Sequence, residues 1–303
     1  MKVYPLCLPC FLNQVRKAAK VAGLSNKETI KIEREVAKFL WKELDPEKSP
    51  GHNATFVHRI FKRMSKVEDP YRNLKDKYNS IALKLEPILE REIYERSDDK
   101  LSVAIKLAAL GNVIDFGVPS TFDLEEEINN FFKTPFAYFD VAILERFLVP
   151  GKTVLYAADN AGEIVFDKFL IRELKKRGLR VVLAVRGAPV LNDATVEDAV
   201  STGVADIVDE VVTAGKDYIG IDFEFASSEF KEAWKNSYFV VSKGQANFET
   251  LDGVYDKDIF FILKAKCEPV AMELSCNVGD LIFLYNKHLL NIKEGNEEAE
   301  KGD

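Results

Sequence analysis

The stretch Val154-Leu-Tyr-Ala-Ala-Asp-Asn-Ala-Gly-Glu163 joins an apolar run to three polar residues and then to a helical pattern. The apolar run is typical of a buried strand that ends at Asp159 and Asn160, and Gly162 suits the turn into the helix. Open α/β sheets bind their ligands beyond the carboxyl ends of their strands. The sequence therefore predicts an α/β fold that delivers Asp159, Asn160 and Glu163 to a ligand crevice.

A second strand repeats this design. Val181-Val-Leu-Ala-Val-Arg186 is followed by a turn that contains Asn192 and Asp193. Neighbouring parallel strands would bring acidic and amide oxygens into one crevice, with Arg186 nearby. Such oxygen ligands suit a hard or borderline divalent cation such as Mg²⁺, Mn²⁺ or Co²⁺. The alternative is that Asp159 or Asn160 only caps the following helix.

The segment Lys243-Gly-Gln-Ala-Asn247-Phe-Glu249 follows another predicted strand. Lys243 could neutralise a phosphate, and Gln245 and Asn247 could bind hydroxyl or phosphoryl oxygens. A Lys-Gly pair is also an ordinary turn. The position of the segment after a strand is what favours a substrate role.

Two lysines lie near the end of the next predicted strand. Lys264 and Lys266 are two residues apart, so they share one face of an extended segment, where a bridging anion would reduce their mutual repulsion. The alternative is a solvated edge. Before the first strand, the Gly-rich bend at residues 111–117 either only stops a helix or brings Asn112 and Asp115 over the crevice.

The periodicity changes near Pro150. Helices are expected at 11–22, 26–44, 53–64, 70–96, 100–112 and 124–132. Pro87 should kink or divide the long helix at 70–96. Strands are expected at 153–158, 180–186, 207–212, 237–242, 259–266 and 281–285, with helices at 164–177, 195–203 and 227–235. This order predicts a three-layer, Rossmann-like, mostly parallel sheet with an N-terminal helical domain. We expect a helical domain over 1–148, an α/β metal- and phosphate-binding domain over 149–290, and a disordered acidic tail over 291–303.

Composition narrows the function classes. The 303 residues carry a net charge of −7, which argues against a general nucleic-acid binder but leaves small anionic substrates open. The sequence shows neither a secretory leader nor an apolar run long enough to span a membrane, so we expect a cytoplasmic protein. The oligomeric state is left open.

The cysteines leave three alternatives. Cys7 and Cys10 form a single CxxC, and the remaining two are Cys267 and Cys276. Because a structural zinc needs four ligands and no second CxxC exists, the pair could be reduced thiols, a redox disulfide, or part of a metal site shared with the other two.

Seven motifs occur in order along nearly the whole chain. They are Cys7-x-x-Cys10 with Gln14, Asp69-Pro-Tyr71 with Lys75 and Asn79, Gly111-Asn112-Val-Ile-Asp115, Asp159-Asn160-Ala-Gly-Glu163, Asn192-Asp193-Ala-Thr195, Lys243-Gly-Gln-Ala-Asn247-Phe-Glu249 and Lys264-Ala-Lys266-Cys267. Together they resemble the damage-control phosphatase family, metal-dependent phosphatases once catalogued as a domain of unknown function, in its archaeal and bacterial CxxC-containing branch.

The resemblance implies that Asp159, Asn160 and Asp193 hold a divalent cation (Mn, Co, Ni or Mg) and that the segment with Lys264 and Lys266 faces the substrate phosphate. One departure concerns specificity. Members that act on sugar phosphates or phosphopantetheine carry an Arg-Thr pair shortly before the lysine that matches Lys264, where this chain has Phe and Ile. Their substrate preferences therefore do not transfer.

The sequence thus favours metal-dependent hydrolysis of a small phosphomonoester, such as a damaged or surplus phosphorylated metabolite. Asp159 or Glu163 would accept the proton of the attacking water, with Lys264 as a further catalytic residue. An aspartyl-phosphate route is less favoured because a metal-bound carboxylate is a poor nucleophile. The expected substrate-binding residues are Asn112, Asp115, Arg186, Lys243, Gln245, Asn247, Lys264 and Lys266.

Two alternatives from other classes remain. A Rossmann-type S-adenosylmethionine-dependent methyltransferase would also place acidic residues after its first strands, but residues 157–162 lack the several glycines that close cofactor approach requires. A non-catalytic protein that binds a metal ion or metabolite would use the same crevice without turnover.

Overall fold

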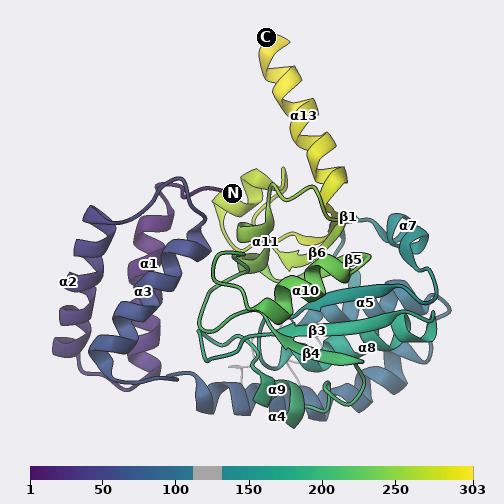
Figure 1. The fold of residues 1–303 in the computed structure, drawn as a ribbon, viewed down its shortest axis with the longest axis horizontal. Helices are drawn as coiled ribbons and strands as arrows, with labels where there is room; N and C mark the ends of the chain where they lie inside the picture. The colour runs from purple at the N-terminus through teal and green to yellow at the C-terminus, as the bar shows by residue number, and fades with distance from the viewer. Residues whose placement is uncertain (112–131, 303) are drawn as a thin grey trace.

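The computed structural model describes residues 1–111 and 132–302, with side chains through residue 294. Its centre is a seven-stranded sheet in the order β1-β7-β6-β5-β2-β3-β4 (Figure 1). The strands are β1 (Phe136–Phe139), β2 (Thr153–Ala157), β3 (Arg180–Val185), β4 (Glu210–Thr213), β5 (Phe239–Lys243), β6 (Ile259–Lys264) and β7 (Leu281–Tyr285).

The strand order places a switch point at the middle of the sheet. Strand β2 pairs in parallel with β3 on one side and with β5 on the other, so the chain winds outward in both directions from this pair. A crevice opens at such a point, beyond the carboxyl ends of the two strands. At the far edge, β7 runs antiparallel to β6 and parallel to β1. The predicted mostly parallel sheet is confirmed.

Helices cover both faces of the sheet, which gives the three predicted layers (Figure 1). Alternate residues of a strand face opposite sides, so Val154 and Tyr156 of β2 join one core while Leu155 and Ala157 join the other. The first core is completed by α4 (Arg72–Leu89), α5 (Lys100–Leu110), α8 (Glu163–Lys176) and α9 (Val196–Ser201). The second is completed by α10 (Ser228–Asn236), α11 (Gln245–Leu251), α12 (Glu268–Glu273) and α13 (Asn286–Gly302).

Three N-terminal helices form a separate lobe beside the sheet (Figure 1). They are α1 (Cys7–Val21), α2 (Asn26–Lys42) and α3 (Pro50–Ser65). Their apolar stripes meet in a third core, which also includes Val190 and Ile219 from loops beyond β3 and β4. The lobe is thereby anchored over the carboxyl ends of the strands.

Several elements differ from expectation. The sequence missed β1, a short aromatic strand within the part expected to be helical, and it missed α11, α12 and α7 (Val141–Leu144). Near Pro87 the helix α4 does not break but continues to Leu89 and then widens into a π-helix, η1 (Glu90–Tyr94). A 3-10 turn, η2 (Glu145–Phe147), follows α7.

The domain boundaries stay a prediction. Both α5 and β1 precede residue 149, yet they pack into the sheet and its helical layer. The helix expected at 124–132 falls almost entirely outside the described residues. The tail from residue 291, expected to be disordered, continues helix α13, because its Glu, Ala and Lys residues are good helix formers. Within the described residues, no helix is long and apolar enough to cross a membrane.

Candidate active site

The turn between β2 and α8 gathers two carboxylates around one carboxamide. Gly162 has a φ of 80° and lets the chain enter α8 directly at Glu163. The Asn160 Nδ2 donates to Asp159 Oδ2 and to Glu163 Oε1, each at 2.9 Å. Asp159 and Glu163 are both buried, so the amide holds them together away from bulk water.

The loop after β3 brings a third carboxylate to the same place. The Ala194 N–H donates to Asp159 O at 2.8 Å, and Ala161 N–H donates to Asn192 O at 2.9 Å. These bonds join the two loops, and Asn160 and Asp193 form an isolated bridge between them. The structure therefore brings together Asp159, Asn160 and Asp193.

These carboxylates are electrostatically crowded. Burial raises the pKa of Asp159 well above its usual range, and the charges of Glu163 and Asp193 raise it further. Burial also raises the pKa of Glu163, against the opposing charges of Lys243 and Lys266. In addition, Glu163 Oε2 is buried without a hydrogen-bond partner among the described residues. A divalent cation at Asp159 and Asp193 would relieve the repulsion between the carboxylates, and Glu163 Oε2 remains able to accept a hydrogen bond from a water molecule.

The donor set fits an oxygen-coordinated cation. Gly244, with a φ of 82°, presents bare backbone to Asp159, and a Cβ there would lie 1.9 Å from Asp159 Oδ2. Among the described residues, no three His, Cys, Asp or Glu side chains already surround one point. The candidate ligands are two carboxylates and one carboxamide, which would leave coordination positions for water or phosphate.

Three residues expected to contact substrate are instead bound to protein groups. Arg186 donates from Nε to Asp193 Oδ2 at 2.7 Å, from Nη2 to Asn247 Oδ1 at 2.9 Å, and from Nη1 to the Gly220 carbonyl. The Asn247 amide donates to the carbonyls of Ala158 and Lys243. Both side chains are buried, and together they brace the strand ends around Asp193.

Lys243 is the third of these residues. Its Nζ lies 2.6 Å from Asp167 Oδ1 on α8, and both side chains are completely buried. The Tyr156 hydroxyl donates to the same carboxylate oxygen at 2.7 Å. The Lys243 charge still reaches the site, because it lowers the pKa of Asp159 and of Glu163 against the effect of burial.

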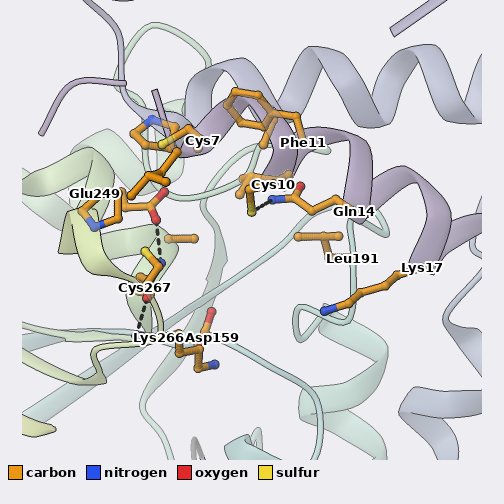
Figure 2. Close-up of a pocket in the computed structure, with 18 of the residues that line it drawn as sticks. Cys7, Cys10, Phe11, Gln14, Lys17, Asp159, Leu191, Glu249, Lys266 and Cys267 are labelled. Carbon is orange, nitrogen blue, oxygen red and sulfur yellow. Dashed lines mark hydrogen bonds between the residues drawn. The ribbon is translucent and has the colours of Figure 1, made fainter. Parts of the chain in front are cut away.

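A cavity of about 770 Å³ lies between the carboxylates and the N-terminal lobe. Figure 2 shows Asp159 and Lys266 at one end, with side chains of α1 across the cavity. Lys266 and Gln245 line the cavity and Lys264, the last residue of β6, does not. The Lys266 N–H donates to Gln245 Oε1 at 3.0 Å, which ties the lysine segment to the start of α11.

One wall of the cavity, which runs from Lys266 to α1, is lined by thiols and by Glu249. All four cysteines are free, and Cys7, Cys10 and Cys267 lie on this wall (Figure 2). Burial raises the pKa of the Cys7 thiol to about 11, so it is neutral at physiological pH. Burial also raises the pKa of Glu249 to about 7, and its Oε1 accepts from Gln245 Nε2 at 2.9 Å.

Two predicted site residues lie outside the described residues, and two residues near the site were not predicted from the sequence. Asn112 and Asp115 fall outside the described residues, although Gly111 packs so closely that a Cβ would lie 2.8 Å from Glu163 Cβ. Asp167 was missed, yet its spacing of four residues from Glu163 puts both on one face of α8. Lys17 of α1, which lines the cavity, carried no sequence signal beyond a charged helix face.

Comparison with known proteins identifies the family. Residues 3–282 match the model of the damage-control phosphatase ARMT1-like domain. The chain belongs to this family. Membership identifies the chain as a phosphatase and confirms the family resemblance drawn from the motifs, while the CxxC branch stays a prediction. Damage-control phosphatases of this family depend on a metal ion.

Several proteins of this family are similar to the chain over most of their own length. It is 38% identical over 285 residues to a damage-control phosphatase of Archaeoglobus fulgidus, covering 93% of this chain and 98% of that one. It is 34% identical to a damage-control phosphatase of Pyrococcus horikoshii over 96% of this chain and all of that one. A crystal structure of a DUF89 family protein from Pyrococcus horikoshii superposes with a TM-score of 0.88 at 34% identity, over 94% of this chain and 99% of that chain.

Proposed function

We propose that this phosphatase hydrolyses a small phosphomonoester, such as a damaged or surplus phosphorylated metabolite, with a divalent cation held by Asp159, Asn160 and Asp193. Mn, Co, Ni and Mg are the candidate metals. The observation that carries the proposal is the crowding of buried carboxylates at the switch point of the sheet, beside a cavity that Lys266 also lines.

The site residues divide the work of phosphoryl transfer. When bound, the cation would supply positive charge to the phosphoryl group and favour deprotonation of the attacking water. We assign to Glu163 the acceptance of that proton, because its Oε2 has no hydrogen-bond partner among the described residues and burial raises its pKa, which makes the carboxylate a stronger base. Asp159 is the alternative base, but a carboxylate that holds a cation is a weaker one.

Lysines adjust the charge around the reacting group. Lys266 lines the cavity next to Asp159 and is the cation we assign to the equatorial phosphoryl oxygens. Lys264 remains a second candidate for this role. Lys243 does not contact the substrate in this proposal. It is buried in its ion pair with Asp167, and its positive charge favours the ionised forms of Asp159 and Glu163.

The leaving group would lie toward the N-terminal lobe. This part of the cavity is lined by the thiols of Cys7 and Cys10 and by apolar side chains such as Phe11 and Leu191. Phe261 and Ile262, which replace the Arg-Thr pair of the sugar-phosphate and phosphopantetheine enzymes, are buried in β6, and the Phe261 ring lies 5.2 Å from that of Phe248. Neither offers a polar group to a sugar or a pantetheine.

Phosphate release from p-nitrophenyl phosphate tests the proposal against its alternatives. Protein stripped with a chelator should be inactive and should regain activity with added Mn²⁺. Metal binding without any turnover, over a panel of phosphomonoesters, would favour a non-catalytic binding protein. Methyl transfer from labelled S-adenosylmethionine would favour a methyltransferase, which family membership already makes the weaker alternative.

The stereochemical course at phosphorus distinguishes the two hydrolytic routes. Direct attack by water is a single in-line displacement, so a phosphorothioate monoester that is chiral through its oxygen isotopes should release thiophosphate of inverted configuration. An aspartyl-phosphate route through Asp159 consists of two displacements, because water attacks the phosphorus of the intermediate, and would retain the configuration. Retention would refute the direct route.

A further inference from the structure

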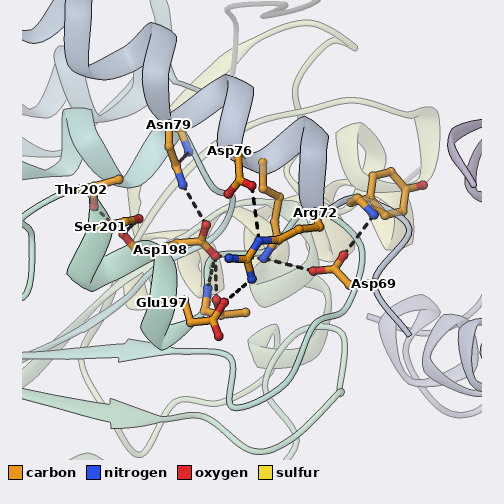
Figure 3. Close-up of polar contacts among 12 residues, drawn as sticks. Asp69, Arg72, Asp76, Asn79, Glu197, Asp198, Ser201 and Thr202 are labelled. Atoms are coloured by element: carbon orange, nitrogen blue, oxygen red, sulfur yellow. Dashed lines mark hydrogen bonds and ion pairs between the residues drawn. The ribbon is translucent and has the colours of Figure 1, made fainter. Parts of the chain in front are cut away.

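Helix α4 carries two buried polar side chains that the reaction does not use. Lys75 is 2% exposed and Asn79 is 5% exposed, whereas Arg72 and Asp76 on the same helix lie at the surface. Figure 3 shows both kinds of side chain next to α9. Buried polar groups are nearly always hydrogen-bonded, so the bonds made by Asn79 and Lys75 indicate what α4 does for the site.

Asn79 bonds directly to the turn that carries the carboxylates. Its Oδ1 accepts from the Gly162 N–H at 2.7 Å. Gly162 has a positive φ and stands between Asn160 and Glu163, so its amide orientation sets where the turn ends and α8 begins. Among the described contacts, this is the bond by which α4 reaches the first candidate metal loop.

The other end of the Asn79 amide reaches the second loop through Asp198. Asn79 Nδ2 donates to Asp198 Oδ1 at 2.8 Å. The remaining oxygen, Asp198 Oδ2, accepts from Lys75 Nζ at 3.0 Å, from Thr195 N–H at 2.8 Å and from Thr195 Oγ1 at 2.7 Å. Thr195 is two residues beyond Asp193, so Asp198 fixes the end of the loop that presents Asp193.

We propose that Asn79 is a positioning residue that links the Gly162 turn to Asp198 and so holds the two candidate metal loops at the separation that the cation requires. This inference rests on the proposed metal-dependent function. Lys75 supports it by neutralising Asp198, which leaves the carboxylate free to accept from Asn79 without an uncompensated buried charge. Removing a side chain that orients the metal ligands without itself binding the metal typically lowers metal affinity by about 10–100-fold.

The test compares two alanine variants on the same helix. Asn79→Ala removes the link to both loops. Arg72→Ala is the matched control, since Arg72 also joins α4 to α9, through its ion pair with Glu197, but makes no contact with Gly162. Mn²⁺ affinity is measured by titration calorimetry and by free-Mn²⁺ electron paramagnetic resonance, so that binding is read independently of activity.

We expect Asn79→Ala to raise the Mn²⁺ dissociation constant by about 10–100-fold and to regain most of its kcat at saturating Mn²⁺. Arg72→Ala should stay within about twofold of wild type. If Asn79→Ala does not fold, Asn79→Ser tests the same link with a smaller polar side chain, and its Mn²⁺ affinity should also fall.

Three results would overturn the inference. A folded Asn79 variant with unchanged Mn²⁺ affinity and a lower melting temperature would show a purely structural role. An equal loss of affinity in Arg72→Ala would show that any weakening of α4 has this effect. Failure of the wild-type protein to bind Mn²⁺ would refute the proposed metal site together with the inference, whereas normal wild-type binding with unchanged variants would refute the inference alone.

Discussion

Lys243 Nζ lies 2.6 Å from Asp167 Oδ1, and neither side chain is exposed to solvent. Asp167 follows the site residue Glu163 by one turn of α8. The pair joins the end of β5 to the middle of α8, across the first core. Lys243, the last residue of β5, is therefore an internal counter-charge and does not face a ligand. This arrangement changes what its substitution should do.

Lys243→Met should mainly destabilise the fold. It leaves the Asp167 carboxylate buried without its cation, and breaking a buried pair in this way costs about 3–5 kcal/mol. The free energy of unfolding from urea denaturation measures the effect, and adding Asp167→Asn should recover part of it. A variant as stable as wild type with a large loss of kcat/KM would instead support direct contact between Lys243 and the phosphate.

Asp159→Asn should abolish metal-dependent turnover without weakening the metal-free fold. The pKa of Asp159 is raised because burial and the neighbouring carboxylates disfavour its charge, so a neutral isostere removes an unfavourable interaction. We expect a metal-free melting temperature at or above that of wild type, and a smaller rise on adding Mn²⁺. Near-normal turnover at saturating metal would contradict the assignment of Asp159 as a ligand.

The sequence was most informative where a strand is buried on both faces. Strand β7 was predicted at its exact bounds, and β2, β3 and β6 began at the predicted residues, because long apolar runs with polar ends leave few alternatives. The four-residue β1 and the seven-residue α11 were missed, since such short elements show too little periodicity to be distinguished from loops.

The site was predictable in part for a related reason. Sequence can show that Asp159 and Asp193 follow neighbouring strands, and strand pairing then brings them together. It cannot show whether a polar side chain at that edge meets a ligand or another protein group. Asp167, the partner of Lys243, lies 76 residues away in the chain, and the Gly220 carbonyl, one of the partners of Arg186, lies 34 residues away, so only the fold reveals these contacts.

Glu249→Gln should flatten the pH dependence of stability. Burial raises the Glu249 pKa to about 7 from the 4.5 expected in the unfolded chain, so between these values the folded state binds more protons than the unfolded state. The contribution of Glu249 to stability is therefore complete below about pH 4.5 and is lost as pH rises to about 7, with a slope of up to about 1.4 kcal/mol per pH unit. Urea denaturation of both proteins from pH 5 to pH 8 measures the difference, and parallel curves would contradict the assignment.

Cys7→Ser combined with Cys10→Ser should leave hydrolysis of p-nitrophenyl phosphate largely unchanged. The proposed chemistry requires no thiolate, and the raised pKa of Cys7 keeps that thiol protonated at neutral pH. The kcat/KM of the double variant and of the wild type is compared with and without a reductant. Complete inactivation of a folded double variant would indicate a redox function or a second metal site.

Lys266→Met and Lys264→Met together decide which lysine acts on the phosphate. Methionine retains much of the apolar stem and removes the charge, so a phosphate-contacting lysine should lose about 2–4 kcal/mol of transition-state stabilisation. Because Lys266 lines the cavity and Lys264 does not, we expect Lys266→Met to lower kcat/KM by roughly 10²–10³-fold and Lys264→Met to have the smaller effect. Mn²⁺ affinity should stay nearly constant in both, since neither lysine is a ligand. A larger loss in Lys264→Met would move the phosphate to the α5 side of β6, and retention of kcat/KM within about threefold in both variants would mean that the phosphate pocket lies elsewhere.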